Sequence, residues 1–216
     1  EYRSGKMVIL TDDEDRENEG DLVFAAAYAT PEKINFMAMH GRGLVCLATT
    51  EERLRRLGLR PLTPDNTSRF GTNFFDPVDA VEETTTGISA FDRAKTVETI
   101  LDPEAGPRDL AKPGHLQTLA ARDGGVLERA GQTEGVVDLA RLAGLPPAGV
   151  LCEIMNDDGT MARMPQLEVF AAKHDLKIIT VRDLIEYRMR KEKLVKPVVT
   201  VPLTNPHGDW SLSYYE

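Results

Sequence analysis

Short apolar runs alternate along the chain with longer stretches that carry an apolar stripe, and turn residues separate them. Runs of about 4 to 8 mostly apolar residues are typical of buried strands, whereas helices take about 10 residues or more. This alternation predicts an α/β (α+β) domain with a mixed sheet and flanking helices. Strands are expected at residues 7–10, 22–25, 43–48, 73–75, 77–80, 116–121, 149–155 and 177–181, and helices at 31–39, 50–57, 89–101, 133–143, 165–174 and 182–192.

Capping and breaking residues support these boundaries. Residues 30–32 read Thr-Pro-Glu, which supplies an N-cap, a proline in the first turn and an early acidic residue. Residues 89–92 form a capping box at the start of another helix. Residues 61–72 are rich in Pro, Asn, Thr and Ser, and residues 102–114 contain three prolines, so both are expected to be connections.

Composition limits the class of protein. A chain of 216 residues with 41% hydrophobic residues can form one large domain, or one domain with an appendage. The net charge of −9 argues against nucleic acid or an anionic membrane as a partner. No apolar run approaches the roughly 18 residues of a transmembrane helix. The two cysteines lie too far apart for a metal-binding pair, and we expect a reduced, cytoplasmic protein.

A loop dense in carboxylates joins the first two expected strands. Residues 11–21 contain seven carboxylates, and because both ends of this segment enter the core it cannot be a solvated tail. Glu17, Glu19 and Asp21 alternate, so an extended backbone would direct all three side chains to one side. Such carboxylates raise one another's pKa unless a cation joins them, and Mg²⁺ or Mn²⁺ is the natural partner for hard oxygen ligands. Arg16 and Gly20 suit an anionic ligand that approaches the backbone closely.

Two general carboxylate motifs compete for this loop. An EF-hand register that starts at Asp15 puts Gly20 at the sixth position but Ala26 at the twelfth, where a bidentate Glu is required. A phosphatase-type D-x-D interpretation fits Asp13 and Asp15, but Glu17 stands where that motif has Thr or Val. The EF-hand interpretation therefore fails, and the phosphatase-type motif remains a weaker alternative.

A second candidate site precedes the helix expected at 133–143. Gly131, Thr133 and the first amides of that helix could hold a phosphate, with Arg129 supplying a fixed positive charge. A plain N-cap with a surface arginine explains the same residues equally well. Glu153 stands in an otherwise apolar strand, where burial would raise its pKa towards a working range, although a core Glu satisfied by hydrogen bonds is the alternative. His115 alone would be an ordinary loop histidine.

The string D-D-E-D-R-E-N-E-G-D-L at 12–22 resembles the signature of the 3,4-dihydroxy-2-butanone 4-phosphate synthase family of riboflavin biosynthesis. The similar segments follow in order and cover roughly residues 5–191. They are T-T-G-I-S-A-x-D-R at 85–93, P-G-H at 113–115, G-G-V-L-E-R at 124–129, T-E at 133–134, V-D-L-A-R-L-A-G-L at 137–145 and P-A-G-V-L-C-E-I-M-N-D-D-G-T-M-A-R at 147–163.

The resemblance implies a compact three-layer fold and a homodimer with sites at the subunit interface. It also implies a lyase that uses Mg²⁺ or Mn²⁺ and converts a phosphorylated ketose, ribulose 5-phosphate, to 3,4-dihydroxy-2-butanone 4-phosphate and formate. The resemblance places Arg16, Glu17 and Asp21 on the substrate, Glu17 and Gln132 on the metal, and His115 in acid–base catalysis. Together with the arguments from the residues, it selects Arg129, Gly131, Gln132 and Thr133 for substrate binding as well, and Glu19, Asp21 and Glu153 for catalysis.

The chain departs from the family pattern at several positions. Where the family has the metal-ligand His of x-G-H-T-E-A, this chain has Gln132, whose oxygen can bind a hard cation but which lacks the basicity of imidazole. Phe91 and Lys95 stand where small and hydroxyl residues are usual, and Lys112 replaces Arg before P-G-H. These changes support an alternative hypothesis, a diverged paralogue with altered sugar-phosphate chemistry or no catalysis that acts as a binding or assembly partner.

The composition changes after residue 193, so we expect a synthase-like domain at 1–193 and a tail at 194–216. The tail weakly resembles the opening strand of the GTP cyclohydrolase II half of bifunctional riboflavin proteins. That half needs a cysteine-liganded zinc site, and no cysteine follows Cys152, so no cyclohydrolase activity is assigned to this chain. A swapped or edge-pairing tail is the alternative.

Overall fold

The computed structural model describes residues 1–216 as two compact units, Glu1–Leu184 and Ile185–Glu216. The proposed boundary between residues 193 and 194 lies inside the second unit, after helix α6 (Val181–Lys191). None of the helices is both long and apolar enough to cross a lipid bilayer.

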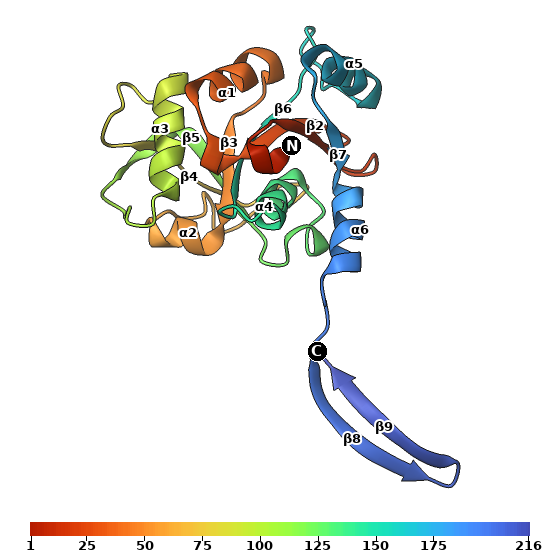
Figure 1. Cartoon of the computed structure of the whole chain (residues 1–216). Coiled ribbons are helices and arrows are strands. Elements are labelled where there is room, and N and C mark those ends of the chain that lie inside the picture. The colour runs from red at the N-terminus through yellow and green to blue at the C-terminus, as the bar shows by residue number, and fades with distance from the viewer. The chain divides into compact units, whose positions relative to one another are not determined.

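The first unit is built on one seven-stranded sheet with the order β4-β5-β3-β6-β2-β1-β7 (Figure 1). Two neighbouring pairs, β1 with β7 and β3 with β5, are parallel, and the other neighbours are antiparallel. The mixed sheet predicted from the sequence is therefore confirmed. Its strands are β1 (Val8–Thr11), β2 (Gly20–Ala25), β3 (Cys46–Thr50), β4 (Phe74–Ala80), β5 (Leu110–Ala121), β6 (Ala148–Glu153) and β7 (Ile178–Thr180).

The helices begin close to the predicted capping residues. Thr30 accepts a hydrogen bond from the Lys33 amide at the start of α1, and Ser89 accepts one from the Asp92 amide at the start of α3. The helices are α1 (Pro31–Phe36), α2 (Glu51–Arg56), α3 (Ala90–Leu101), α4 (Gln132–Leu142), α5 (Met164–His174) and α6, with a π-helical turn at Met37–Gly41 and short 3-10 turns at Tyr2–Ser4, Ala26–Tyr28 and Gly125–Leu127.

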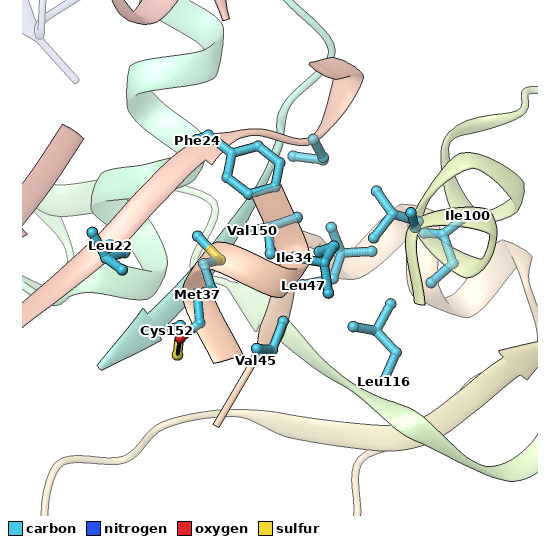
Figure 2. Packing of buried hydrophobic residues seen from close by; sticks show 14 of the residues in the cluster. Leu22, Phe24, Ile34, Met37, Val45, Leu47, Ile100, Leu116, Val150 and Cys152 are labelled. Carbon is cyan, nitrogen blue, oxygen red and sulfur yellow. Dashed lines mark hydrogen bonds between the residues drawn. The ribbon is translucent and has the colours of Figure 1, made fainter. Parts of the chain in front are cut away.

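Helices cover both faces of the sheet and give three layers. Phe24, Leu47 and Val150 point into a core that also contains Ile34 of α1 and Ile100 of α3 (Figure 2). Successive residues of a strand face opposite sides, so the neighbours of these residues face the other layer.

That other layer is α4. A Cβ atom added to Gly149 of β6 would collide with Val136 of α4, and one added to Gly135 of α4 would collide with Leu10 of β1. The helix therefore lies very close to the central strands, and its N-terminus is held firmly against the sheet.

The structure corrects the prediction that residues 102–114 are a connection and that a strand begins only at 116. Strand β5 already begins at Leu110, and β4 runs without interruption where two short strands were expected. The register between β4 and β5 shifts twice in this region, and such irregular pairing near a sheet edge tolerates a proline. A side chain at Gly114 would overlap the backbone of Val78, so glycine is required for the close approach.

The second unit contains the hairpin of β8 (Pro197–Asn205) and β9 (Gly208–Tyr215). Its strands pair antiparallel, and the hydroxyl groups of Thr200 and Ser213 lie 2.8 Å apart across the pair. Residues 194–216 thus contain a β-hairpin. The sequence suggested a single opening strand, or a swapped or edge-pairing tail.

Replacing Leu47 by Ala tests the central core. Leu47 is fully buried in β3, and removing its side chain should lower the free energy of unfolding by about 2–5 kcal/mol. Leu62→Ala is the matched control because Leu62 is 52% exposed, and its effect should stay within about 0.5 kcal/mol. Denaturant unfolding followed by circular dichroism measures both, and equal losses would contradict the assigned core.

Asp92 predicts a pH dependence of stability. The backbone amide of Thr85, with further donors from Thr85, Gly87 and Ser89, lowers the pKa of this carboxyl from 3.8 to about 2. Since the folded pKa is depressed, the stabilisation is present above about pH 4 and is lost as the pH falls towards 2. Asp92→Asn should therefore be less stable than the parent at about pH 6, and the difference should shrink over this acid range.

The control for Asp92→Asn is Glu98→Gln, which removes an exposed carboxyl from the same helix. Guanidinium unfolding at a series of pH values measures both variants against the parent. A difference for Asp92→Asn that does not change with pH would contradict this assignment.

Candidate functional site

Polar side chains gather along one row that crosses the sheet. Asp21 of β2 pairs directly with Glu153 of β6, and both side chains lie on the face covered by α4. Leu44 lies just before β3, the strand between β6 and β5, and its amide donates to Glu153 Oε2 at 2.8 Å. Strands β5 and β6 lie on either side of β3, so at the usual strand spacing they are roughly 10 Å apart.

Asp12 organises the acidic loop between β1 and β2. Its side chain is fully buried and accepts hydrogen bonds from Arg16 Nη1 at 2.7 Å and from the amides of Glu17 at 3.0 Å and Glu19 at 2.9 Å. Asn18 takes a left-handed conformation with φ of 54°, which Asn tolerates better than most residues. The loop is thus closed around one internal carboxylate. Sequence reasoning did not single out Asp12, because nothing in the acidic run marks which carboxylate turns inwards.

The carboxylates selected from the sequence come together at the end of β2. Burial raises the pKa of Asp21, and the charges of Glu153, Glu17 and Glu19 raise it further. Burial is also the main cause of the raised pKa of Glu19 and of Glu153. These groups therefore hold protons more readily than ordinary carboxyls, or gain strongly from a nearby cation.

The donor set fits a hard divalent cation. Asp21 Oδ1 is buried without a hydrogen-bond partner, and the groups around it are carboxylate oxygens, which are the ligands that Mg²⁺ and Mn²⁺ prefer. No three His, Cys, Asp or Glu side chains already converge as a preformed metal site. The residues present therefore suit such a cation in chemistry, although their side chains are not arranged as a closed cage.

The N-terminus of α4 lies at the other side of the site. Gly131 is the N-cap, and a side chain there would collide with Arg129 Nη1 and lie 2.9 Å from Arg16 Nη2. Arg129 is held by Glu134 Oε2 at 2.5 Å, Thr72 Oγ1 at 2.8 Å and the Phe70 carbonyl at 3.1 Å. Two fixed guanidinium groups thus flank a helix N-terminus that lacks a side-chain cap, an arrangement suited to an anion.

Gln132 and Thr133 begin this helix and are buried. Gln132 Oε1 accepts a hydrogen bond from Arg16 Nη1 at 3.0 Å, whereas its Nε2 is buried without a partner. The structure therefore joins the acidic loop to the predicted phosphate cradle through Arg16 and Gln132. Whether Gln132 ligates a metal stays a prediction.

His115 forms a pair with Asp79, a residue that sequence reasoning missed. Asp79 Oδ2 lies 2.7 Å from His115 Nδ1, and Asp79 Oδ1 accepts the His115 amide at 2.8 Å. Gly87, with φ of 94°, packs against both side chains, and a Cβ atom there would lie 2.6 Å from His115 Nδ1. The available signal was a carboxylate in the mostly apolar strand that ends at Ala80.

Two of the unusual residues lie away from the carboxylate cluster. Phe91 is 72% exposed on α3. Lys95 forms ion pairs with Glu83 at 3.1 Å and Glu98 at 3.4 Å. Within this chain the structure does not bring these residues to the site, in contrast to Gln132.

Comparison with known proteins agrees with this arrangement. The family model described as 3,4-dihydroxy-2-butanone 4-phosphate synthase matches residues 1–187. Riboflavin biosynthesis protein RibBA of Aquifex aeolicus is 59% identical over 100% of this chain and 53% of its own length. A 3,4-dihydroxy-2-butanone 4-phosphate synthase of Neisseria meningitidis serogroup B is 54% identical over 100% of the chain and 59% of its own length. The chain thus spans little more than half the length of these curated relatives.

Solved structures give the same result. A two-domain 3,4-dihydroxy-2-butanone 4-phosphate synthase of A. baumannii, RibBX, superposes with a TM-score of 0.90 and 50% identity, covering 100% of this chain and 63% of the other. A synthase solved in complex with two magnesium ions gives a TM-score of 0.83 and 38% identity, covering 88% and 94%. The chain belongs to the 3,4-dihydroxy-2-butanone 4-phosphate synthase family.

Proposed function

We propose that this chain is a lyase that converts ribulose 5-phosphate to 3,4-dihydroxy-2-butanone 4-phosphate and formate in riboflavin biosynthesis. The observation that carries the proposal is the site itself. Arg16 connects the acidic loop, through Asp12, to Gln132 at the start of α4, and the carboxylate cluster lies beside it. A phosphorylated ketose presents a dianion at one end and a carbonyl with neighbouring hydroxyls at the other. The two sides of the site match these two ends in charge.

The α4 side would bind the phosphate. Arg16 and Arg129 keep their positive charges close to Gly131, and the amides of the first turn add donors that the helix itself does not use. Glu134 and Asp12 neutralise part of this charge but hold each guanidinium in one place. Such fixed donors bind an anion with a smaller entropic cost than mobile side chains.

The carboxylate side would hold Mg²⁺ or Mn²⁺, with Glu17 as a ligand and Glu19, Asp21 and Glu153 around it. A bound divalent cation would polarise the carbonyl and hydroxyl oxygens of the ketose. The presence of two magnesium ions in a related synthase supports this assignment.

Three residues would move protons. The raised pKa values of Asp21 and Glu153, caused first by burial, suit carboxyls that take up and return a proton during turnover. Asp79 accepts from His115 Nδ1, so His115 Nε2 is available as a base.

The atoms of the reaction balance without a further reactant. The two products together contain all atoms of ribulose 5-phosphate, so any water lost when a hydroxyl leaves must return before formate is released. Proton abstraction next to the ketone, loss of that water, rearrangement of the carbon skeleton and release of formate all require acid–base groups close to the same carbons. The site supplies these groups from β2, β5 and β6.

The diverged paralogue remains the second candidate, and Gln132 is the observation that favours it. In this case the protein would bind a sugar phosphate without cleaving it. The resemblance also supports a homodimer with sites at the subunit interface, and the partial exposure of His115 is compatible with a second subunit closing the site.

Formate release from ribulose 5-phosphate with Mg²⁺ distinguishes the two functions. The enzyme should turn over at about 1 per second or faster, chelation should abolish release, and Mg²⁺ or Mn²⁺ should restore it. If the parent protein is inactive and the Gln132→His variant is active, the chain is a synthase that has lost activity through the residue at position 132. Inactivity of both proteins would contradict the synthase assignment.

Asp79→Asn tests the histidine pair. The amide would keep an acceptor for the His115 backbone but would donate to Nδ1, so Nε2 would carry the proton and could not act as a base. We expect kcat to fall by about 100-fold to 10,000-fold, as for His115→Ala, with little change in KM. Asp76→Asn, a change on the same strand outside the site, should leave kcat unchanged, and activity of Asp79→Asn near the parent level would refute the role of the pair.

A further inference from the structure

The amide of Gln132 has a fixed orientation. The side chain is 4% exposed, and its Oε1 lies 3.0 Å from Arg16 Nη1. An arginine can only donate, so the atom that faces it must be the oxygen. Turning the amide over would place Nε2 against Nη1, two donors in a buried space, and would leave Arg16 with one acceptor fewer.

Arg16 cannot easily release this oxygen. The two hydrogens of Nη1 are directed to Asp12 Oδ2 and to Gln132 Oε1. Asp12 is in turn fixed by the amides of Glu17 and Glu19. A cation on Gln132 Oε1 would have to share the oxygen with a positively charged guanidinium.

The other half of the amide has hydrogen-bond capacity that the chain does not use. Nε2 is buried and has no partner, and a buried donor without an acceptor costs free energy. The adjacent residue, Gly131, is flanked by the guanidinium groups of Arg16 and Arg129 and begins a helix whose first amides have no side-chain cap. A group that satisfies Nε2 here must be an acceptor, and the surrounding positive charge selects an anionic oxygen.

We propose that Gln132 binds a phosphoryl oxygen of the substrate through Nε2 and positions Arg16 through Oε1, and that it is not a metal ligand. This inference rests on the proposed function, because the phosphate is that of the phosphorylated ketose. The metal would then be held by carboxylates without a ligand from α4. Position 132 then serves the anion side of the site, while Glu17, whose Oε2 lies 3.1 Å from Arg16 Nη1, connects the carboxylate cluster to that side.

Two separate binding measurements test the proposal. Inorganic phosphate is titrated calorimetrically into the metal-free protein, and Mn²⁺ alone is titrated and followed by electron paramagnetic resonance. Gln132→Met preserves the volume but removes both hydrogen-bonding groups, whereas Gln132→Glu keeps an acceptor for Arg16 and removes the donor. Gln166→Met makes the same change at an exposed position of α5, where the side chain accepts only the Arg163 amide, and is the control; near-UV circular dichroism verifies folding.

We expect both Gln132 variants to bind phosphate about 10-fold to 100-fold more weakly than the parent and to bind Mn²⁺ no more weakly. Gln166→Met should match the parent in both titrations. Weaker Mn²⁺ binding by Gln132→Met with unchanged phosphate binding would overturn the proposal and make Gln132 a metal ligand. Should Gln132→Met fail to fold, Gln132→Leu, which also removes both hydrogen-bonding groups without adding charge, is judged by the same criteria.

Failure of this inference can be distinguished from failure of the proposed function. A parent protein that releases formate but binds no phosphate would refute only the role of Gln132. A parent that binds phosphate through Gln132 but releases no formate would refute the lyase and keep the anion site.

Discussion

The buried carboxylate of Asp12 is the constraint on which the site depends. A carboxylate that is removed from water must be fully hydrogen-bonded, and three donors from its own loop satisfy it. Because two of these donors are backbone amides, the path of the loop is fixed, and so are the directions of Glu17 and Glu19. The third donor is Arg16, whose guanidinium extends this order to α4 through Gln132.

Opposite charges are thereby separated within one site. Each arginine of the anion side is held by a buried carboxylate, Arg16 by Asp12 and Arg129 by Glu134. Asp21 and Glu153 lie on β2 and β6, whereas Glu17 Oε2 lies 3.1 Å from Arg16 Nη1 and so stands between the two sides. A substrate with a phosphate at one end and oxygen ligands for a cation at the other would be favoured with its phosphate at α4, since the reverse direction would bring phosphate to Asp21 and Glu153.

The sequence was sufficient for the parts of the site that local motifs encode. The acidic run between two apolar runs indicated a loop between two strands, and Gly131 before a helix remains a predicted phosphate cradle. The extended backbone expected through Glu17, Glu19 and Asp21 is not present, because Asn18 is left-handed, with φ of 54°. Asp12, Asp79 and Glu134 were missed because each acts through a partner that the sequence does not mark, at a separation decided only by folding. Strand β5 was predicted too short for a different reason. Pro113 would interrupt a regular strand, but it is tolerated here because the register between β4 and β5 already shifts in this region.

The direct pairing of Asp21 with Glu153 carries a cost in stability. Like charges directly opposite each other on antiparallel strands are destabilising, and here both carboxyls are also largely withdrawn from water. On the opposite face, the neighbouring residues Leu22 and Cys152 are fully buried in the core, so the strands stay paired despite the repulsion. A cation or a proton relieves the same repulsion. The strain in the sheet is therefore coupled to the two species that the proposed chemistry needs, and their binding should make the end of β2 more rigid.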